Sequence, residues 1–235
     1  PLTDNNGKVT SHLIGLFARV PNLLQKGIKP VFVFDGTPPA LKAKTHAIRR
    51  GIKEKALESY NKASEEEDVE LMSKYSRQLS KLNQEMIDES KELLHALGLP
   101  TVQAPSEAEA QCAYMAKKKK VWASASQDYD SLLFGAPKLI QNLTLSSKRK
   151  LPGGQYKSIS PYMIELDQVL NDLGITQDQL IVMGILTGTD FNPGGVKGIG
   201  PKKAEKLVQT GKKFETIFAE LETDFDWKEI FDIFK

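Results

Sequence analysis

The chain is poor in the residues that disulfide and zinc chemistry require. It has one cysteine, Cys112, and three histidines, His12, His46 and His95, which lie far apart in the sequence. A single cysteine excludes an internal disulfide framework and fits a reducing compartment. With so few and so widely spaced ligands, Cys/His zinc sites are excluded as well.

Other patterns are also missing. No apolar run approaches the roughly 20 residues that a membrane span needs, and no signal-peptide pattern opens the chain, so we expect no membrane partner. Neither a P-loop motif nor a G-x-G-x-x-G motif occurs, which argues against a nucleotide cofactor. No G-x-S-x-G motif occurs, and no histidine has a sequence context typical of a catalytic triad. Attack by a metal-activated water is the hydrolytic route that remains.

What is present is an ordinary globular composition, with 235 residues, 40% hydrophobic and 26% charged. This fits a soluble protein with one large domain or two small ones. The formal net charge of +2 is too small to identify a partner. Because the chain begins at Pro1 without a methionine and ends soon after Trp227, we expect a fragment of a longer protein.

The first two thirds alternate between helical and strand patterns. A helix is expected from Thr10 or Ser11, as the N-cap, to Gly27, and another from Ser106 to about Lys120. Apolar runs predict buried strands, and strands that alternate with helices imply a mostly parallel central sheet flanked by helices, an α/β fold. The expected strands cover residues 30–35, 101–103, 121–126 and 138–143.

The remaining segments have helical composition. Residues 42–81 have a patchy apolar face until Leu79, and residues 82–97 are expected to form the next helix. From Ser160 on, the pattern is helical throughout, including helices over 164–173 and 177–186. We therefore predict an α/β core over residues 1–155 and a helical region over 156–235.

Several carboxylates lie at the expected ends of core elements. Four of them form pairs two residues apart, in residues 106–109 and 127–130. Strand ends are where open α/β sheets place their ligands. Clustered carboxylates stay ionised together only when cations neutralise them, and oxygen-only sites favour Mg²⁺ or Mn²⁺. The candidate metal ligands are Asp35, Glu107, Glu109, Asp128, Asp130 and Asp190.

Each of these residues also has a purely structural interpretation. Ser106 and Glu109 fit a helix capping box, and Asp128 or Asp130 could N-cap a short helix. Asp35 could be a turn residue, and Asp190 could belong to an ordinary loop after Gly188. Together, however, they would be six unrelated caps and turns, with no competing catalytic set, so the pattern favours a metal site.

A glycine-rich hairpin over residues 194–200 is the second motif. Glycines allow backbone N–H groups to approach a ligand closely, and Pro201 fits the first position of a following helix. The N-terminus of that helix is an anion site, to which Lys202, Lys203 and Lys206 add positive charge. This arrangement is typical of helix-hairpin-helix elements that hold a nucleic-acid phosphate, although a plain turn between two helices remains the alternative.

A basic stretch is the third motif. From Lys42 to Lys62 there are seven Lys or Arg residues against two Glu, and residues 65–68 then reverse the sign. A solvated helix face is the usual explanation of such a run. Lys42 and Arg49 are seven residues apart and would share one helix face, just after Asp35. A basic segment beside a carboxylate cluster could hold a phosphodiester.

These motifs together resemble those of flap endonucleases, the structure-specific 5′ nucleases of the XPG-type superfamily. The matching segments are VFVFDGTPP around Asp35, QAPSEAEAQ around Glu107, ASQDYDSLLFG around Asp128 and GTDFNPGGVKGIG around Asp190. They span essentially the whole chain in the order of the family. Residues 192–195 and 148–153 resemble the archaeal branch.

The resemblance implies a PIN-like 5′ nuclease fold and a two-metal phosphodiesterase. The six carboxylates would hold two Mg²⁺, or Mn²⁺, directly or through water, and Lys42 and Arg49 would contact the scissile phosphate. A helical arch over about residues 37–84 would admit the 5′ flap. A helix-two-turn-helix over about 177–210 would grip the duplex, and its loop would hold a K⁺. The DNA-binding residues implied are Lys197, Gly198, Gly200, Lys202, Lys203 and Lys206.

The resemblance also implies partners. The substrate would be branched DNA with a 5′ flap, cut during replication and repair by a monomer. An archaeal enzyme would act in the cytoplasm and a eukaryotic one in the nucleus. The family has an upstream strand with a further metal-binding Asp, and a downstream tail that binds a sliding clamp, both outside this chain. Alternatives are another 5′ nuclease, either an exonuclease or a junction resolvase, and a non-catalytic DNA-junction binder.

Overall fold

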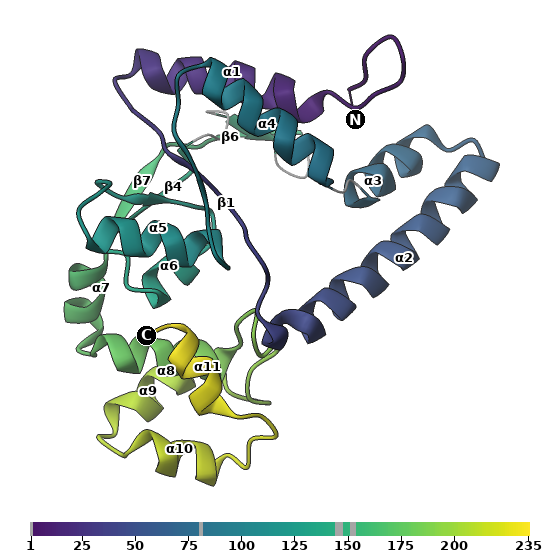
Figure 1. Ribbon diagram of the computed structural model, residues 1–235. Helices are drawn as coiled ribbons and strands as arrows, with labels where there is room; N and C mark the ends of the chain where they lie inside the picture. The colour runs from purple at the N-terminus through teal and green to yellow at the C-terminus, as the bar shows by residue number, and fades with distance from the viewer. Residues whose placement is uncertain (1, 80–81, 144–147, 151–153) are drawn as a thin grey trace. The chain divides into compact units, whose positions relative to one another are not determined.

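The computed structural model describes residues 2–79, 82–143, 148–150 and 154–235 (Figure 1). The chain divides into two compact units, each assembled from two segments. The first unit consists of Pro1–Phe34 and His46–Gln103, and the second of Asp35–Thr45 and Ala104–Lys235. The predicted boundary near residue 155 concerns functional domains and stays a prediction.

The first unit pairs two short strands under two helices. Its strands are parallel, with Phe32 opposite Thr101, as the apolar runs predicted. Helix α1 packs on α4, and Val20, Leu94 and Leu99 are buried between these elements. Its elements are α1 (Ser11–Gln25), β1 (Phe32–Phe34), most of α2 (Ala43–Glu65), α3 (Val69–Leu79), α4 (Gln84–Ala96) and β2 (Thr101–Gln103).

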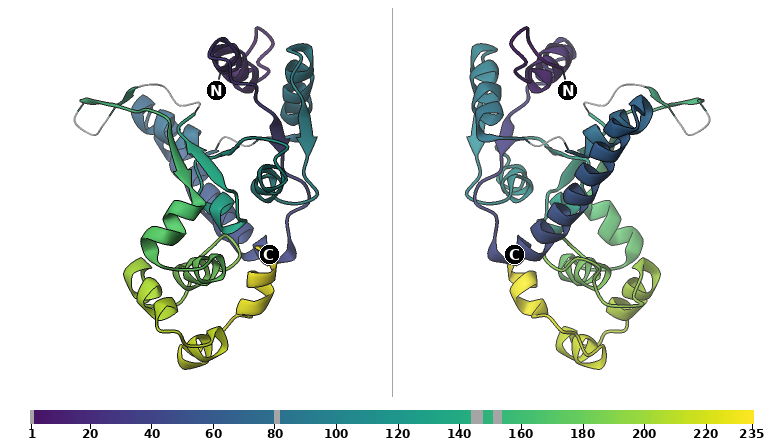
Figure 2. Two further views of the ribbon diagram at one scale, coloured as in Figure 1. Left: turned by 90° about the vertical axis from the view of Figure 1, so that its left-hand side faces the viewer. Right: turned by 90° about the vertical axis from the view of Figure 1, so that its right-hand side faces the viewer.

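The polar stretch after Lys42 forms one long helix. Helix α2 runs without a break for 23 residues, as Figure 2 shows. Of its side chains in the first unit, the buried ones include the small residues Ala56 and Ala63. Helix α4 begins where the Asn83 side chain accepts a hydrogen bond from the Met86 amide at 2.8 Å. The described part of the region predicted as an arch therefore consists mainly of helices, with short non-helical connections such as residues 66–68.

The second unit combines a small mixed sheet with a group of helices. Helix α5 precedes β3, and α6 separates β3 from β4. Helices α7 to α11 follow the last strand (Figure 1). The elements are η1 (Ala40–Lys42), α5 (Ala108–Lys117), β3 (Ser124–Ala125), α6 (Asp130–Leu133), β4 (Lys138–Gln141), β5 (Lys148–Lys150), β6 (Tyr156–Ser158), β7 (Tyr162–Glu165), α7 (Leu166–Leu173), α8 (Gln177–Thr187), α9 (Pro201–Gln209), α10 (Phe214–Glu220) and α11 (Trp227–Ile233).

The sheets confirm the α/β class and its parallel pairs, and they correct two details. Strand β3 is parallel to β4, but β7 joins β4 in the antiparallel direction and β5 pairs antiparallel with β6. The expectation of a wholly helical pattern from Ser160 on is therefore wrong, because Met163 and Ile164 pair with the exposed edge of β4. Among the described residues, the strands form three small sheets rather than one.

The core of the second unit lies around α8. Its apolar residues include Ile181, Val182, Ile185 and Leu186, and none of these four exposes any surface. A capping box between Thr176 and Gln179 fixes the start of the helix. From the first helical position, the Gln177 side chain donates to the carbonyls of Leu132 and Leu133 at 3.0 and 2.8 Å. Helix α6 is thereby anchored to the helical group.

Two sequence expectations remain, one for the archaeal-like stretch and one for membrane spans. Residues 151–153 of the archaeal-like stretch 148–153 lie outside the described residues. In the described part of the chain, no helix is both long enough and apolar enough to cross a membrane.

Candidate metal centre and nucleic-acid interface

Asp35 lies against the N-terminus of α5. Its carboxylate accepts a hydrogen bond from the Ala108 amide at 2.8 Å, where a helix has unpaired N–H groups. The next residue, Gly36, donates its amide to the Ser106 carbonyl at 2.6 Å. A side chain at Gly36 would place its Cβ 2.2 Å from the Ala104 carbonyl oxygen, so only glycine allows this approach. The sequence D-G therefore positions Asp35 on α5.

Glu109 points away from its own helix end. The N-cap of α5 is Glu107, without a side-chain capping hydrogen bond, so the alternative interpretation of Ser106 and Glu109 as a capping box is wrong. The Glu109 carboxylate instead accepts a hydrogen bond from the Ser126 hydroxyl. That hydroxyl also accepts the Asp128 amide at 3.0 Å. Ser126 therefore joins the α5 carboxylate to the loop after β3.

Three carboxylates converge at this point. Glu109, Asp128 and Asp130 each offer an oxygen, and these oxygens all lie within 4.8 Å of one another. The N-cap of α6 is Tyr129 rather than either aspartate, so the N-cap interpretation of Asp128 and Asp130 is not correct. Asp130 opens the helix, and its amide donates to the Asp128 carboxylate at 3.4 Å.

Burial and repulsion raise the pKa values of two of these carboxyl groups, Asp130 and Glu109. Burial is the main cause of the raised pKa of Asp130, to about 7, with Asp128, Glu109 and Asp190 contributing repulsion. The pKa of Glu109 is also raised, mainly by burial, although the Ser126 hydrogen bond opposes the shift. Without a cation, the cluster thus disfavours full ionisation at neutral pH.

Lys42 connects two further carboxylates. Its ammonium lies 2.5 Å from the Glu107 carboxylate and 3.1 Å from that of Asp190. Burial alone would lower the pKa of Lys42, but hydrogen bonds to Glu107 and Asp190 outweigh it, and the pKa is raised. The same ammonium lies 5.4 Å from the centre of the Phe191 ring.

The loop that carries Asp190 is fixed by buried polar contacts. Asn192 is buried; its amide donates to the Ile185 carbonyl at 2.7 Å and its carbonyl oxygen accepts from the Thr189 hydroxyl at 2.7 Å. From the first turn of α2, the buried Thr45 hydroxyl donates to the Asp190 carbonyl. Asp190 is consequently held both by its own loop and by the start of α2.

The two residues predicted to contact the scissile phosphate lie in different elements. Lys42 is the last residue of η1, whereas Arg49 lies within α2, so the two do not occupy one regular helix as expected. Lys42 and all six candidate carboxylates belong to the second unit, and Arg49 belongs to the first. The role assigned to Arg49 stays a prediction.

The glycine hairpin joins α8 to α9 as predicted. Gly194, Gly195 and Gly198 have φ values of 87°, 56° and 80°, a conformation that favours glycine. Pro201 is at the first position of α9, and Gly200 is the N-cap. Exposed around this turn are Lys197, Lys202, Lys203 and Lys206, and Lys203 donates to the Gly198 carbonyl at 2.9 Å.

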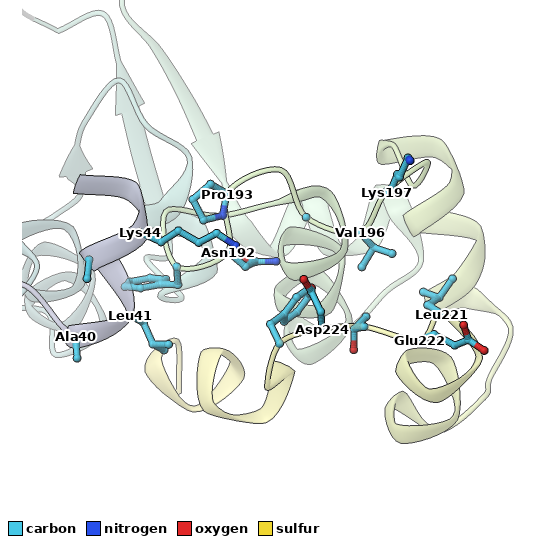
Figure 3. Close-up of a pocket in the computed structure, with 15 residues that line it drawn as sticks. Ala40, Leu41, Lys44, Asn192, Pro193, Val196, Lys197, Leu221, Glu222 and Asp224 are labelled. Atoms are coloured by element: carbon cyan, nitrogen blue, oxygen red, sulfur yellow. The ribbon is translucent and has the colours of Figure 1, made fainter. Parts of the chain in front are cut away.

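A cleft of about 650 Å³ lies between the start of α2 and the loop after Asp190 (Figure 3). Lys44 and Lys197 line it together with the acidic residues Glu222 and Asp224. Because charges of both signs meet there, the cleft is not a simple anion site.

Sequence reasoning missed the residues that hold the ligands in place. Thr45, Ser126 and Asn192 contact the candidate ligands or their loop, and none of the three was assigned a role from the sequence. Ser126 stands within the matching segment around Asp128, but its contact with Glu109 is visible only in the structure. Nothing in the sequence around Thr45 indicates its contact with Asp190, 145 residues away.

The donor set fits a hard divalent cation. It consists of carboxylate oxygens from three residues within 4.8 Å, and the pKa of one is raised to about 7. Oxygen ligands of this kind suit Mg²⁺ or Mn²⁺. A bound cation would also relieve the repulsion that the cluster shows without it.

Comparison with known proteins agrees with this geometry. Residues 2–56 match the XPG N-terminal domain, and residues 98–190 match the XPG I-region. The solved structure of flap endonuclease-1 from Methanococcus jannaschii is similar over 100% of this chain and 70% of its own, with 45% identity and a TM-score of 0.74. The chain belongs to the flap endonuclease family.

Two further similarities agree with this assignment. Flap endonuclease 1 from Staphylothermus marinus is 54% identical over 92% of this chain. The chain spans 62% of the length of that relative. The catalytic core of Rad2, solved in complex with a DNA substrate, is 26% identical, covers 99% of this chain and 72% of its own, and has a TM-score of 0.67.

Proposed function

We propose that this chain is the nuclease part of a flap endonuclease, which hydrolyses DNA phosphodiesters at junctions between single strand and duplex. The observation that carries the proposal is the convergence of Glu109, Asp128 and Asp130 within 4.8 Å. The basic glycine hairpin on the same unit supports DNA as the substrate. Membership of the flap endonuclease family supports the reaction.

Two divalent ions are the proposed cofactors. Glu109, Asp128 and Asp130 would hold one, with Asp35, Glu107 and Asp190 as further ligands, directly or through water. When bound, such ions lower the pKa of an attacking water and neutralise charge on the phosphate and leaving oxygens. The chain positions these ligands through the Asp35 contact with α5 and the Ser126 contact with Glu109.

Lys42 would change partners when DNA binds. Its ammonium is held between Glu107 and Asp190, next to the cluster, and it carries a full charge because those carboxylates raise its pKa. A phosphodiester at the cluster would offer it a third anionic partner. We propose that Lys42 orients the scissile phosphate and stabilises the charge that develops there.

The hairpin and its lysines would hold the duplex. Backbone amides at the start of α9 and the ammonium groups of Lys197, Lys202, Lys203 and Lys206 can contact phosphates without reading bases. A K⁺ in the same loop is a further proposal. It would have to share the Gly198 carbonyl with Lys203, which already donates to it at 2.9 Å.

A substrate panel tests the proposed reaction. The intact protein would be given Mg²⁺ and equal concentrations of a 5′-flap duplex, a 3′-flap duplex, a gapped duplex and a four-way junction. We expect cleavage of the 5′ flap near its junction, and none in EDTA. Preferential cleavage of the gapped duplex or the four-way junction would instead indicate an exonuclease or a resolvase. Binding without cleavage at any Mg²⁺ or Mn²⁺ concentration would indicate a non-catalytic junction binder.

A further inference from the structure

Four consecutive lysines, Lys117 to Lys120, end helix α5, and all four are exposed. The candidate ligands Glu107 and Glu109 lie at the opposite end of the same helix. A helix of 10 residues is about 15 Å long, so the lysines form a surface separate from the carboxylate cluster. Figure 1 shows α5, whose two ends carry these two groups.

The backbone of this lysine turn is fixed. Lys119 donates its amide to the Ala116 carbonyl at 3.0 Å, and Lys120 donates to that of Met115 at 2.9 Å. These two hydrogen bonds form a Schellman motif, whose left-handed position is usually glycine. Lys119 occupies that position with a φ of 56°. The chain thus carries a positive charge where backbone conformation favours glycine.

Two exposed aromatic rings flank the lysine turn. Tyr114 precedes it and is 56% exposed, and Trp122 follows it and is 66% exposed. The Lys118 ammonium lies 5.7 Å from the centre of the Tyr114 ring, and the Lys138 ammonium lies 4.8 Å from that of Trp122. Lys138 opens β4, and Trp122 lies two residues before β3, the strand that runs parallel to β4.

Opposing charge at this surface is sparse. Lys138 pairs with Glu165 at 3.2 Å. In the part of the chain that the structure describes, none of the ammonium groups of residues 117–120 forms an ion pair. One or two basic residues in the last turn of α5 would be enough to neutralise the dipole at its C-terminus. Four lysines between two exposed aromatic rings exceed that need.

We propose that residues 114, 117–120, 122 and 138 form a second nucleic-acid site, which holds a single strand. The ammonium groups would contact successive phosphates, and the faces of Trp122 and Tyr114 would stack with unpaired bases. This site extends the proposed function in DNA processing, but its binding needs neither the carboxylate cluster nor a metal. It would hold a part of the substrate away from the bond that is cut.

Binding of a fluorescein-labelled single-stranded oligonucleotide in EDTA tests this site by fluorescence anisotropy. Lys118→Gln/Lys120→Gln removes two expected contacts with single-strand phosphates, so the slope of log K against log salt should fall by about 1.4. If the effect of these contacts vanishes near 1 M salt, binding at 0.1 M salt should be weaker by about 25-fold. The matched control is Lys212→Gln/Lys228→Gln, which removes two exposed lysines of the same unit. It should leave the slope within about 0.3 of the wild-type value.

Two further variants separate binding from folding. Lys119→Gly should keep or raise the melting temperature, because glycine suits the left-handed position. It should still weaken binding of the oligonucleotide. Trp122→Ala should weaken oligonucleotide binding about fivefold or more, and the oligonucleotide should no longer quench the tryptophan fluorescence of the protein. If these lysine variants still cleave the flap and bind the single strand as tightly as wild type, the second site is wrong and the proposed function remains intact. Equal binding of polyglutamate, without quenching of Trp122, would assign the surface to an acidic protein segment and also overturn the proposal.

Discussion

Asp130 makes the metal-free protein sensitive to pH. Its pKa is raised from 3.8 to about 7, mainly by burial, so the folded state holds a proton that the unfolded state has lost between these values. The contribution of Asp130 to the free energy of unfolding is fully present below about pH 4 and is lost as the pH rises through 7. At about 1.4 kcal/mol per pKa unit, the loss is at most about 4 kcal/mol.

Asp130→Asn should remove this pH dependence. In EDTA, urea unfolding should show the variant to be more stable than wild type at pH 8, by up to a few kcal/mol, with little difference at pH 4. Asp172→Asn, on the exposed face of α7, is the matched control and should follow wild type at both pH values. A constant difference between Asp130→Asn and wild type from pH 4 to pH 8 would contradict the raised pKa.

Lys42 opposes cations at the same site. Its ammonium lies 2.5 Å from Glu107 and 3.1 Å from Asp190, two of the proposed ligands. Lys42→Met should therefore strengthen Mn²⁺ binding, by roughly 1–4 kcal/mol for the removal of a unit charge a few ångströms away, while slowing flap cleavage. Mn²⁺ binding can be followed by electron paramagnetic resonance of the free ion. Lys44→Met, an exposed lysine two residues on, should change neither, and weaker Mn²⁺ binding by Lys42→Met would contradict this role.

At the scale of elements, the start of α2 is tied to the loop that carries Asp190. The buried Thr45 hydroxyl donates to the Asp190 carbonyl, and valine would leave that carbonyl without its donor. Thr45→Val should cost about 1–3 kcal/mol of unfolding free energy, measured by urea denaturation. Thr45→Ser keeps the hydroxyl and should cost less than half as much. Equal losses in both variants would show that the methyl group, and not the hydrogen bond, matters.

The elements predicted correctly from the sequence are marked by an apolar run, by apolar periodicity, or by capping and turn residues. Helices α1, α8 and α9 and strands β1 and β2 lie where periodicity and capping residues placed them. Strand β7 and the β5–β6 hairpin were missed because no separate apolar run marks them. The sequences of β5 and β6 are the polar KRK and YKS, and β7 continues directly into α7. Strand β3 is shorter than expected, since the lysine turn takes up the residues before it.

The same limit applies to the candidate site. Its carboxylates could be predicted because aspartates after apolar runs lie at strand ends, and the structure places Asp35 and Asp128 there. The contacts of Ser126 with Glu109 and of Thr45 with Asp190 could not be predicted, because they depend on how distant segments pack. Local patterns identify the ligands of such a site, and tertiary structure decides what holds them.

At the scale of the whole molecule, four separated segments supply the carboxylates to one unit. Asp35, the pair on α5, the pair after β3 and Asp190 all belong to the second unit, although that unit is interrupted by the first. Three of these carboxylates converge within 4.8 Å. We infer that these converging carboxylates hold the metal that cleaves DNA.

Single-turnover cleavage of a 5′-flap duplex in Mg²⁺ by wild type, Asp128→Asn and Asp172→Asn, with DNA affinity measured in EDTA, tests whether the cluster holds the catalytic metal. We predict that Asp128→Asn binds the flap as tightly as wild type and cleaves it at least about a hundredfold more slowly. Asp172→Asn, the same chemical change on an exposed face of α7, should match wild type in both. Cleavage by Asp128→Asn at the wild-type rate would show that the carboxylate cluster does not hold the catalytic metal.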